Sequence, residues 1–176
     1  MPKTILKILA FAATCLAFSI PTLHAEVTPE QRESTWNALL ETYLNEQGLW
    51  NYASLVAERN LFDQLYESLS KSSPDATPNR YSSEDEQLAY WINAYNIATV
   101  RGVLDHYPIE SVIDVKKPSF FSLFEGGGFF VAQKFRIGDS KTSLYKLENK
   151  VVRKRFLDPR YHFALNCAAS GCPQLP

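Results

Sequence analysis

The last fifteen residues, HFALNCAASGCPQLP, carry the side chains best suited to chemistry. His162 precedes two cysteines, Cys167 and Cys172, that lie five positions apart. A histidine beside a thiol is the pairing of a cysteine nucleophile with its base, whereas two thiols in an oxidising compartment form a disulfide. Metal ligation by these three side chains is a further alternative, but their spacing matches no usual zinc or redox pattern. We predict a Cys167–Cys172 disulfide and no metal site; a reactive thiol or two inert cysteines remain as alternatives.

Polar side chains upstream could share a site with this histidine. Asn93 and Asn96 lie three residues apart in a strongly apolar segment, so a helix would place both amides near one face. Buried amides need hydrogen-bond partners, so the pair either braces neighbouring backbone or contacts a ligand. Glu148 adjoins an apolar stripe and has Arg153 nearby, which fits a structural ion pair or a catalytic carboxylate. We predict that Glu148 reaches the Asn93/Asn96 face and that its helix packs on theirs.

Four helices are expected to position these residues. A 3.6-residue periodicity predicts helices over residues 28–44, 53–70, 87–104 and 143–156. Thr28 is expected to cap the first, Ser83 and Glu86 form a capping box before the third, and Thr142 or Ser143 caps the fourth. The third is apolar nearly all round, which is typical of a buried helix. Residues 71–83 are polar and contain prolines, which predicts an exposed loop.

Two short strands are expected to complete the fold. Alternation predicts a strand within residues 129–139 and a second one over 161–167. In a regular second strand, His162 and Asn166 would face away from Cys167, so His162 could not activate that thiol. The fold class is therefore α+β and mostly helical, with a buried central helix packed against a small β-sheet.

The N-terminus predicts export. Lys3 and Lys7 precede an apolar stretch that is too short for a comfortable membrane span and ends before Ala25. We interpret residues 1–25 as a cleaved signal peptide and residues 26–176 as one periplasmic or secreted domain. No second membrane span is expected. The formal charge of −1, without a basic cluster, argues against nucleic acid as a partner, and no cofactor is predicted.

Three segments in order, LAYWINAYNIATV, TSLYKLENKVVR and DPRYHFALNCAASGCPQL, resemble the family catalogued as domain of unknown function 547 (DUF547). The resemblance covers residues 88–176, and the earlier segments WNALLETYL and NYASL resemble the usual N-terminal lead-in of the family. Relatives continue past the Cys-Pro step, which implies that the domain is incomplete at its C-terminus and leaves the apolar side chains of residues 161–167 poorly covered. The resemblance implies no established reaction. It places family motif positions at Trp91, Asn93, Tyr95, Asn96, Leu144, Glu148, Arg153, Pro159, Arg160, His162, Asn166, Cys167, Cys172 and Pro173.

Two functions from different classes fit these residues. The first is a non-catalytic binding or scaffolding domain, with binding contributed by Trp91, Asn93, Asn96, Arg153 and Asn166. The alternative is a thiol-dependent hydrolase or transferase acting on peptide or amide bonds. In that alternative Cys167 or Cys172 is the nucleophile and His162 its base, Glu148 orients the base, and an asparagine supports the electrophile. We favour the non-catalytic interpretation.

Overall fold

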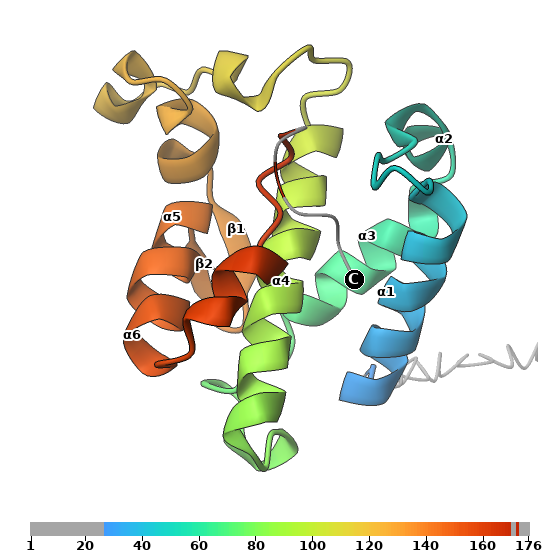
Figure 1. Cartoon of the computed structure of the whole chain (residues 1–176), viewed down its shortest axis with the longest axis vertical. Coiled ribbons are helices and arrows are strands. Elements are labelled where there is room, and N and C mark those ends of the chain that lie inside the picture. The colour runs from blue at the N-terminus through green and yellow to red at the C-terminus, as the bar shows by residue number, and fades with distance from the viewer. Residues whose placement is uncertain (1–26, 170–171, 173–176) are drawn as a thin grey trace, which may run out of the picture.

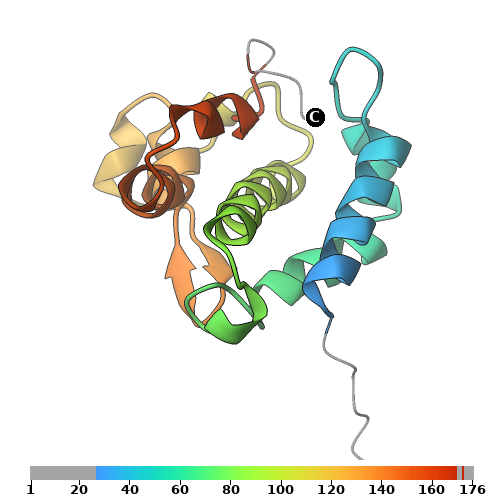
Figure 2. The same cartoon turned by 60° about the horizontal axis from the view of Figure 1, so that its bottom comes forward.

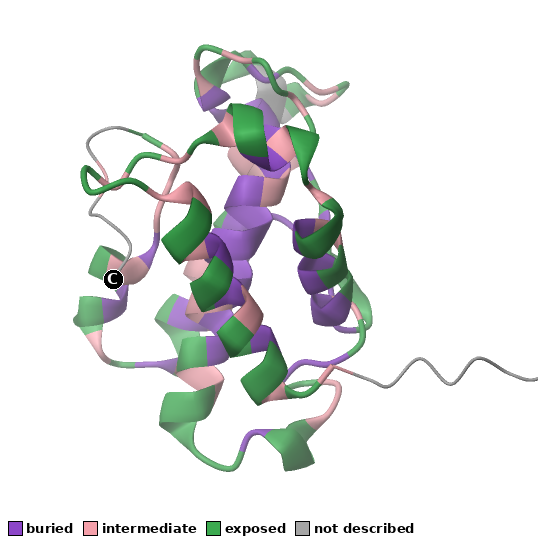
Figure 3. Cartoon of the chain, turned by 90° about the vertical axis from the view of Figure 1, so that its right-hand side faces the viewer, coloured by how far each residue is buried: buried purple, intermediate pink, exposed green. Residues whose placement is uncertain are grey.

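A long central helix organises the structure. The computed structural model describes residues 27–169 and 172, so the predicted signal peptide lies outside the described residues. Helix α4 (Glu84–Leu104) runs through the middle of the molecule (Figure 1). Ser83 and Glu86 form the capping box that begins it. From Tyr90 onward most of its residues are buried, as expected for a helix apolar on all sides (Figure 3).

Three helices cover one side of α4. Helix α1 (Pro29–Tyr43) begins at Thr28, whose side chain accepts from the Gln31 backbone N–H, and α2 (Tyr52–Ala57) and α3 (Asn60–Leu69) follow. The helix predicted over residues 53–70 is thus two helices with a break before Asn60. Helix α1 lies on one side of α4, and the segments near the end of the described chain lie on the other side (Figure 2).

A second helical column covers the opposite side. It consists of α5 (Leu144–Lys146), η5 (Leu147–Val152) and α6 (Arg153–Arg155), which follow one another without a gap. Ser143 caps its start, and the wider turn at η5 is a π-helical segment of the kind often found at functional sites. Segment η5 packs on α4, which confirms the predicted packing of these two helices.

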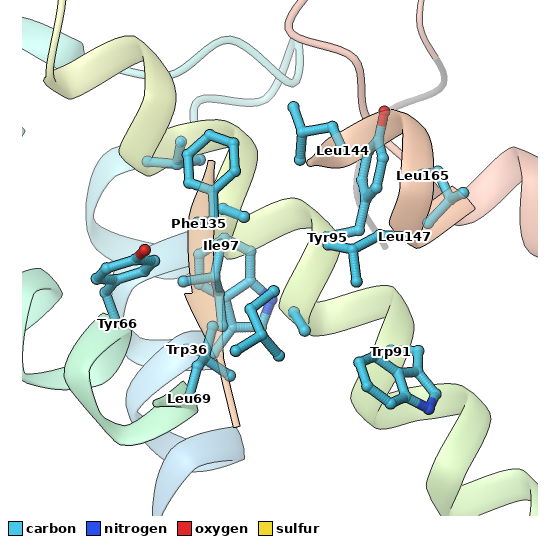
Figure 4. Packing of buried hydrophobic residues seen from close by; sticks show 14 of the residues in the cluster. Trp36, Tyr66, Leu69, Trp91, Tyr95, Ile97, Phe135, Leu144, Leu147 and Leu165 are labelled. Atoms are coloured by element: carbon cyan, nitrogen blue, oxygen red, sulfur yellow. The ribbon is translucent and has the colours of Figure 1, made fainter. Parts of the chain in front are cut away.

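The core therefore has two halves separated by α4. One half joins Trp36, Leu69 and Phe135 to Ile97, and the other joins Leu144, Leu147 and Leu165 to Tyr95 (Figure 4). Each of these side chains is at least nine-tenths buried, and burying a large apolar side chain contributes roughly 1.5–3 kcal/mol. Both flanking layers are consequently needed to keep α4 out of water.

Short elements connect these layers. Strands β1 (Phe135–Ile137) and β2 (Ser140–Thr142) form a two-stranded antiparallel sheet in which Phe135 lies opposite Thr142. The other elements are the short helical turns η1 (Pro78–Arg80), η2 (Val112–Asp114), η3 (Phe120–Leu123), η4 (Gly127–Ala132) and η6 (Pro159–Ala164). The mostly helical α+β class is confirmed. Among the described residues, no helix combines the length and the apolar character needed to cross a membrane.

Both predicted strands need correction. Only residues 135–137 of the first are extended, because residues 127–132 wind into η4 and bury Phe129 completely. The predicted strand over 161–167 is wrong, since η6 begins the segment: Asp158 caps it and Pro159 supplies the fixed φ of a first helical residue. The predicted alternation of faces is therefore absent, with Leu165 buried and Phe163 68% exposed.

Gly128 provides a test of the packing between η4 and η2. A Cβ at this position would lie 1.8 Å from the backbone oxygen of Val115, which is too close for any relaxation of a side chain to relieve. We expect Gly128→Ala to lower the free energy of unfolding by more than about 3 kcal/mol in urea titrations. Gly48→Ala is the control variant, because the positive φ of 73° at this position is unfavourable for a residue with a side chain. We expect Gly48→Ala to lower the free energy of unfolding by about 1 kcal/mol. Equal effects would contradict this account.

Candidate functional site

The two cysteines at the end of the chain form a disulfide. Cys167 is bonded to Cys172, which confirms the predicted disulfide. The Cys167 backbone N–H also donates to the Cys172 sulfur at 3.2 Å, and the Ala168 N–H donates to Asn166 Oδ1 at 2.8 Å. Ala168 has a φ of 57°, an uncommon conformation for a residue with a side chain. The chain here is a closed loop in which neither sulfur is a free thiol.

Asn96 holds this loop against α4. Its Nδ2 donates to the Ala164 carbonyl and its Oδ1 accepts from the Asn166 N–H, both at 2.9 Å. The Asn96 side chain is buried, so these bonds satisfy groups that would otherwise be costly to bury. Asn96 is therefore a brace for the segment that carries the cysteines.

Asn93 has different neighbours from Asn96. It lies on the side of α4 that faces α1 and lines a cleft between the two helices. Its side chain makes no hydrogen bond within the part of the chain that the structure describes. The two amides are three residues apart on α4 but have different neighbours: Asn96 bonds to the backbone at 164 and 166, and Asn93 lines the cleft. Their sharing of one site with Glu148 stays a prediction.

Glu148 and His162 approach each other on the opposite side of α4. The carboxylate on η5 lies 3.8 Å from the His162 Nδ1 on η6, and the side chains are 23% and 67% exposed respectively. Burial raises the pKa of the adjacent Tyr95, and the Glu148 charge adds to that increase, so this phenol stays protonated. A carboxylate beside an imidazole can orient a proton acceptor. Within residues 27–169 and 172, however, no hydrogen bond joins His162 to either sulfur.

The remaining motif side chains are structural in their contacts. Arg153 donates from Nε to the Tyr161 hydroxyl at 3.3 Å, which joins α6 to η6. Trp91 is only 4% exposed, and the Arg155 guanidinium lies 5.4 Å above its ring. The Trp91 indole N–H has no acceptor among the described residues. A ring this deeply buried is unavailable to a ligand arriving from solvent.

The cleft beside Asn93 contains residues that the sequence analysis did not identify. Arg32, Trp36, Tyr81 and Tyr90 all line it, and each is less than about one-tenth exposed. The available signal was the position of Arg32 on α1: it precedes Trp36 by one helical turn and so falls on the apolar stripe. A buried arginine among apolar side chains is costly, so Arg32 is expected to have a specific structural or binding role.

The described residues contain no group of three or more His, Cys, Asp or Glu side chains placed to hold a metal ion. The disulfide sulfurs are bonded to each other, and Glu148 and His162 supply two potential ligands at most.

Comparison with known proteins identifies the class of this protein. The family model described as "Protein of unknown function, DUF547" matches residues 78–176, which is more than half of the chain. The chain belongs to this DUF547 family, as its three motifs predict. No curated protein and no solved structure shows a significant match to it. The matched region includes α4, the Glu148–His162 pair and the disulfide loop, whereas α1 precedes it.

The two asparagines provide a matched pair of mutations. We expect Asn96→Ala to lower the free energy of unfolding by about 1–3 kcal/mol, because it removes two hydrogen bonds from a buried side chain to partly buried backbone groups. Asn93→Ala on the same helix should change stability by less than about 0.5 kcal/mol, since no hydrogen bond is lost. Chemical denaturation of both variants measures the difference. Equal destabilisation would show that Asn93 also braces the fold.

Proposed function

We propose that this chain is an exported, non-catalytic binding domain of the DUF547 family. The observation that carries the proposal is the disulfide between Cys167 and Cys172. Thiol-dependent catalysis requires a thiolate, and a sulfur bonded to another sulfur cannot attack a substrate carbonyl. In the oxidised state, Cys167 and Cys172 therefore have a structural role: their bond closes the loop between them.

The contacts of the other motif residues support the same function. Asn96 is fully engaged with backbone, Arg153 with Tyr161, and the Trp91 ring is covered. His162 lies beside Glu148, away from any hydrogen bond to the sulfurs among the described residues. These residues brace an end of the chain against α4, whereas Asn93 is left open in a cleft.

Export is supported by two features that do not depend on each other. The first 25 residues have the basic and then apolar pattern of a secretory signal. A disulfide persists in oxidising compartments such as the periplasm and is rare in the cytosol. We therefore propose a periplasmic or secreted location for the mature chain.

The proposal is tested on protein secreted from its own signal. We expect alkylation of the native protein followed by mass spectrometry to modify neither cysteine without reductant and both cysteines after reduction. The mature N-terminus should follow Ala25. Two alkylated thiols in native exported material, or an unprocessed N-terminus, would contradict the corresponding part of the proposal.

A kinetic experiment separates binding from thiol catalysis. Reduced and oxidised protein are incubated with a panel of peptide p-nitroanilides and thioesters, beside Cys167→Ser and Cys172→Ser variants treated in the same way. We expect no turnover that depends on the reduced thiol. Turnover that appears on reduction and is lost in Cys167→Ser or in Cys172→Ser would establish the hydrolase or transferase instead.

The same cysteine variants report on stability. The disulfide closes a loop with a sequence separation of five residues, so loop-closure entropy predicts a contribution of about 2 kcal/mol. We expect Cys167→Ser/Cys172→Ser to unfold at correspondingly lower urea concentration than the oxidised protein. An unchanged transition midpoint would show that the loop is not closed in solution.

A further inference from the structure

The cleft between α1 and α4 has the size of a small-molecule site. It encloses about 460 Å³ and is bounded by α1, by the segment 79–82 and by α4. Its aromatic lining comes from Trp36, Tyr81 and Tyr90, and Ile97 adds an aliphatic surface. Ligand pockets typically have volumes of roughly 300–1,000 Å³ with apolar walls and a few polar groups. The cleft meets that description.

Arg32 is a buried cation that has no carboxylate partner among the described residues. It is 5% exposed, and within residues 27–169 and 172 its guanidinium donates to neutral oxygens: the Ser68 hydroxyl and carbonyl, the Ser72 hydroxyl and the Tyr81 hydroxyl. No carboxylate of the described chain lies within ion-pair distance of it. Buried charges in proteins are normally paired, because removing a lone charge from water is costly.

One donor of this guanidinium is available to a ligand. Nη1 carries two N–H groups, and its single acceptor in the described chain is the Tyr81 hydroxyl at 3.0 Å. The Asn93 amide lines the same cleft and makes no hydrogen bond to described residues. An anionic group in the cleft would thus find a fixed positive charge and a free amide donor.

The mouth of the cleft is acidic. Glu30, Glu33 and Glu86 line it and are exposed, against one further cation, Arg80. The Glu86 carboxylate is held in place by the N–H groups of Ser82 and Ser83. These hydrogen bonds lower its pKa, and the Glu30 charge opposes that decrease. Such a mouth repels polyanions and attracts an ammonium group.

We propose that this cleft binds the α-carboxylate end of an amino acid or short peptide. The carboxylate lies on Arg32 and Asn93, the ammonium group lies toward the glutamates of the mouth, and an apolar side chain packs on the aromatic lining. This inference rests on the proposed binding function and names its ligand class. A phosphate or nucleotide would meet the same cation, but the acidic mouth disfavours its multiple charges.

The competing explanation is that Arg32 only braces the fold. Its hydrogen bonds join α1 to the end of α3 and to the segment before α4, and its guanidinium lies 5.4 Å from the Tyr90 ring. Truncating Arg32 would therefore confound folding with binding. The decisive substitutions are placed at Asn93, which contributes to the cleft but to no hydrogen bond of the scaffold.

The first experiment is isothermal titration calorimetry on the oxidised mature chain with four probes. L-phenylalanine and L-alanyl-L-phenylalanine carry the free carboxylate, L-phenylalaninamide lacks it, and N-acetyl-L-phenylalanine lacks the ammonium group. We expect one or both carboxylate probes to bind and the amide to bind at least ~10-fold more weakly, as loss of a charge-assisted hydrogen bond requires. Whichever of the first two probes binds more tightly distinguishes a free amino acid from a peptide C-terminus.

The second experiment adds a charge inside or outside the cleft. Asn93→Asp should weaken binding of the better carboxylate probe by ~10-fold or more, because it places a like charge beside the ligand. Asn37→Asp adds the same charge at an exposed position of α1 outside the cleft lining and should leave affinity unchanged. Circular dichroism melts of both variants confirm that they are folded.

Three results would overturn the inference. They are an amide that binds as tightly as the carboxylate, equal affinities for Asn93→Asp and Asn37→Asp, and no binding of any probe at about 10 mM, the weakest affinity that a specific site of this kind would show. None of these depends on the cysteines. Thiol-dependent turnover would therefore reject the non-catalytic function separately, whatever the cleft binds.

Discussion

Burial of α4 is the constraint on which the rest of the structure depends. The helix spans 21 residues, and most of those from Tyr90 onward are buried. A helix with apolar side chains on every face cannot remain in water, so elements from both ends of the sequence must cover it. Polar groups inside the helix are satisfied locally where they can be: Thr99, for example, donates from its hydroxyl to the Tyr95 carbonyl at 2.9 Å. The layered arrangement of α1–α3 and the 144–155 column follows from this requirement.

Coverage of α4 from both sides also explains why its two asparagines have different partners. Side chains that leave the helix in different directions meet different covering elements. The Asn96 amide forms hydrogen bonds with the backbone of residues 164 and 166. Asn93, three residues earlier, lines the cleft beside α1. Proximity along the helix is therefore a poor guide to shared function when both sides of the helix are covered. The Glu148–His162 pair and the Arg32 cleft are surfaces on opposite sides of the same element.

The segment after α6 is held by two kinds of bond that act together. Asn96 fixes its backbone from the side of α4, and the disulfide closes the loop that follows. Apolar burial contributes less here, since Phe163 is 68% exposed while Leu165 is buried. Hydrogen bonds and the disulfide thus hold this segment where its apolar contacts are few. Such bonds fix the geometry of a short segment more closely than non-directional apolar contact does.

The sequence by itself determined the features that depend on neighbouring residues. Ser83 with Glu86, Thr28 and Ser143 cap helices where their patterns predict, because each cap satisfies N–H groups within one turn. The buried character of α4, the disulfide and the family also follow from local pattern. The two strand predictions were wrong in extent or type because strand formation depends on distant residues. Alternating apolar residues fit a strand only if a partner strand exists, and the caps at Asp158 and Pro159 favoured a helical turn over residues 159–164.

Only the tertiary structure decided what the polar residues contact. Arg32 donates to Tyr81, 49 residues away, and Asn96 bonds to a backbone N–H 70 residues away. The cleft between α1 and α4 is formed by segments that no short-range pattern connects. A capping box involves residues within four positions of one another, so it can be recognised from a short stretch of sequence. The environment of a buried charge depends instead on which distant surfaces the packing of α4 brings around it, and that is settled only when the whole chain has folded.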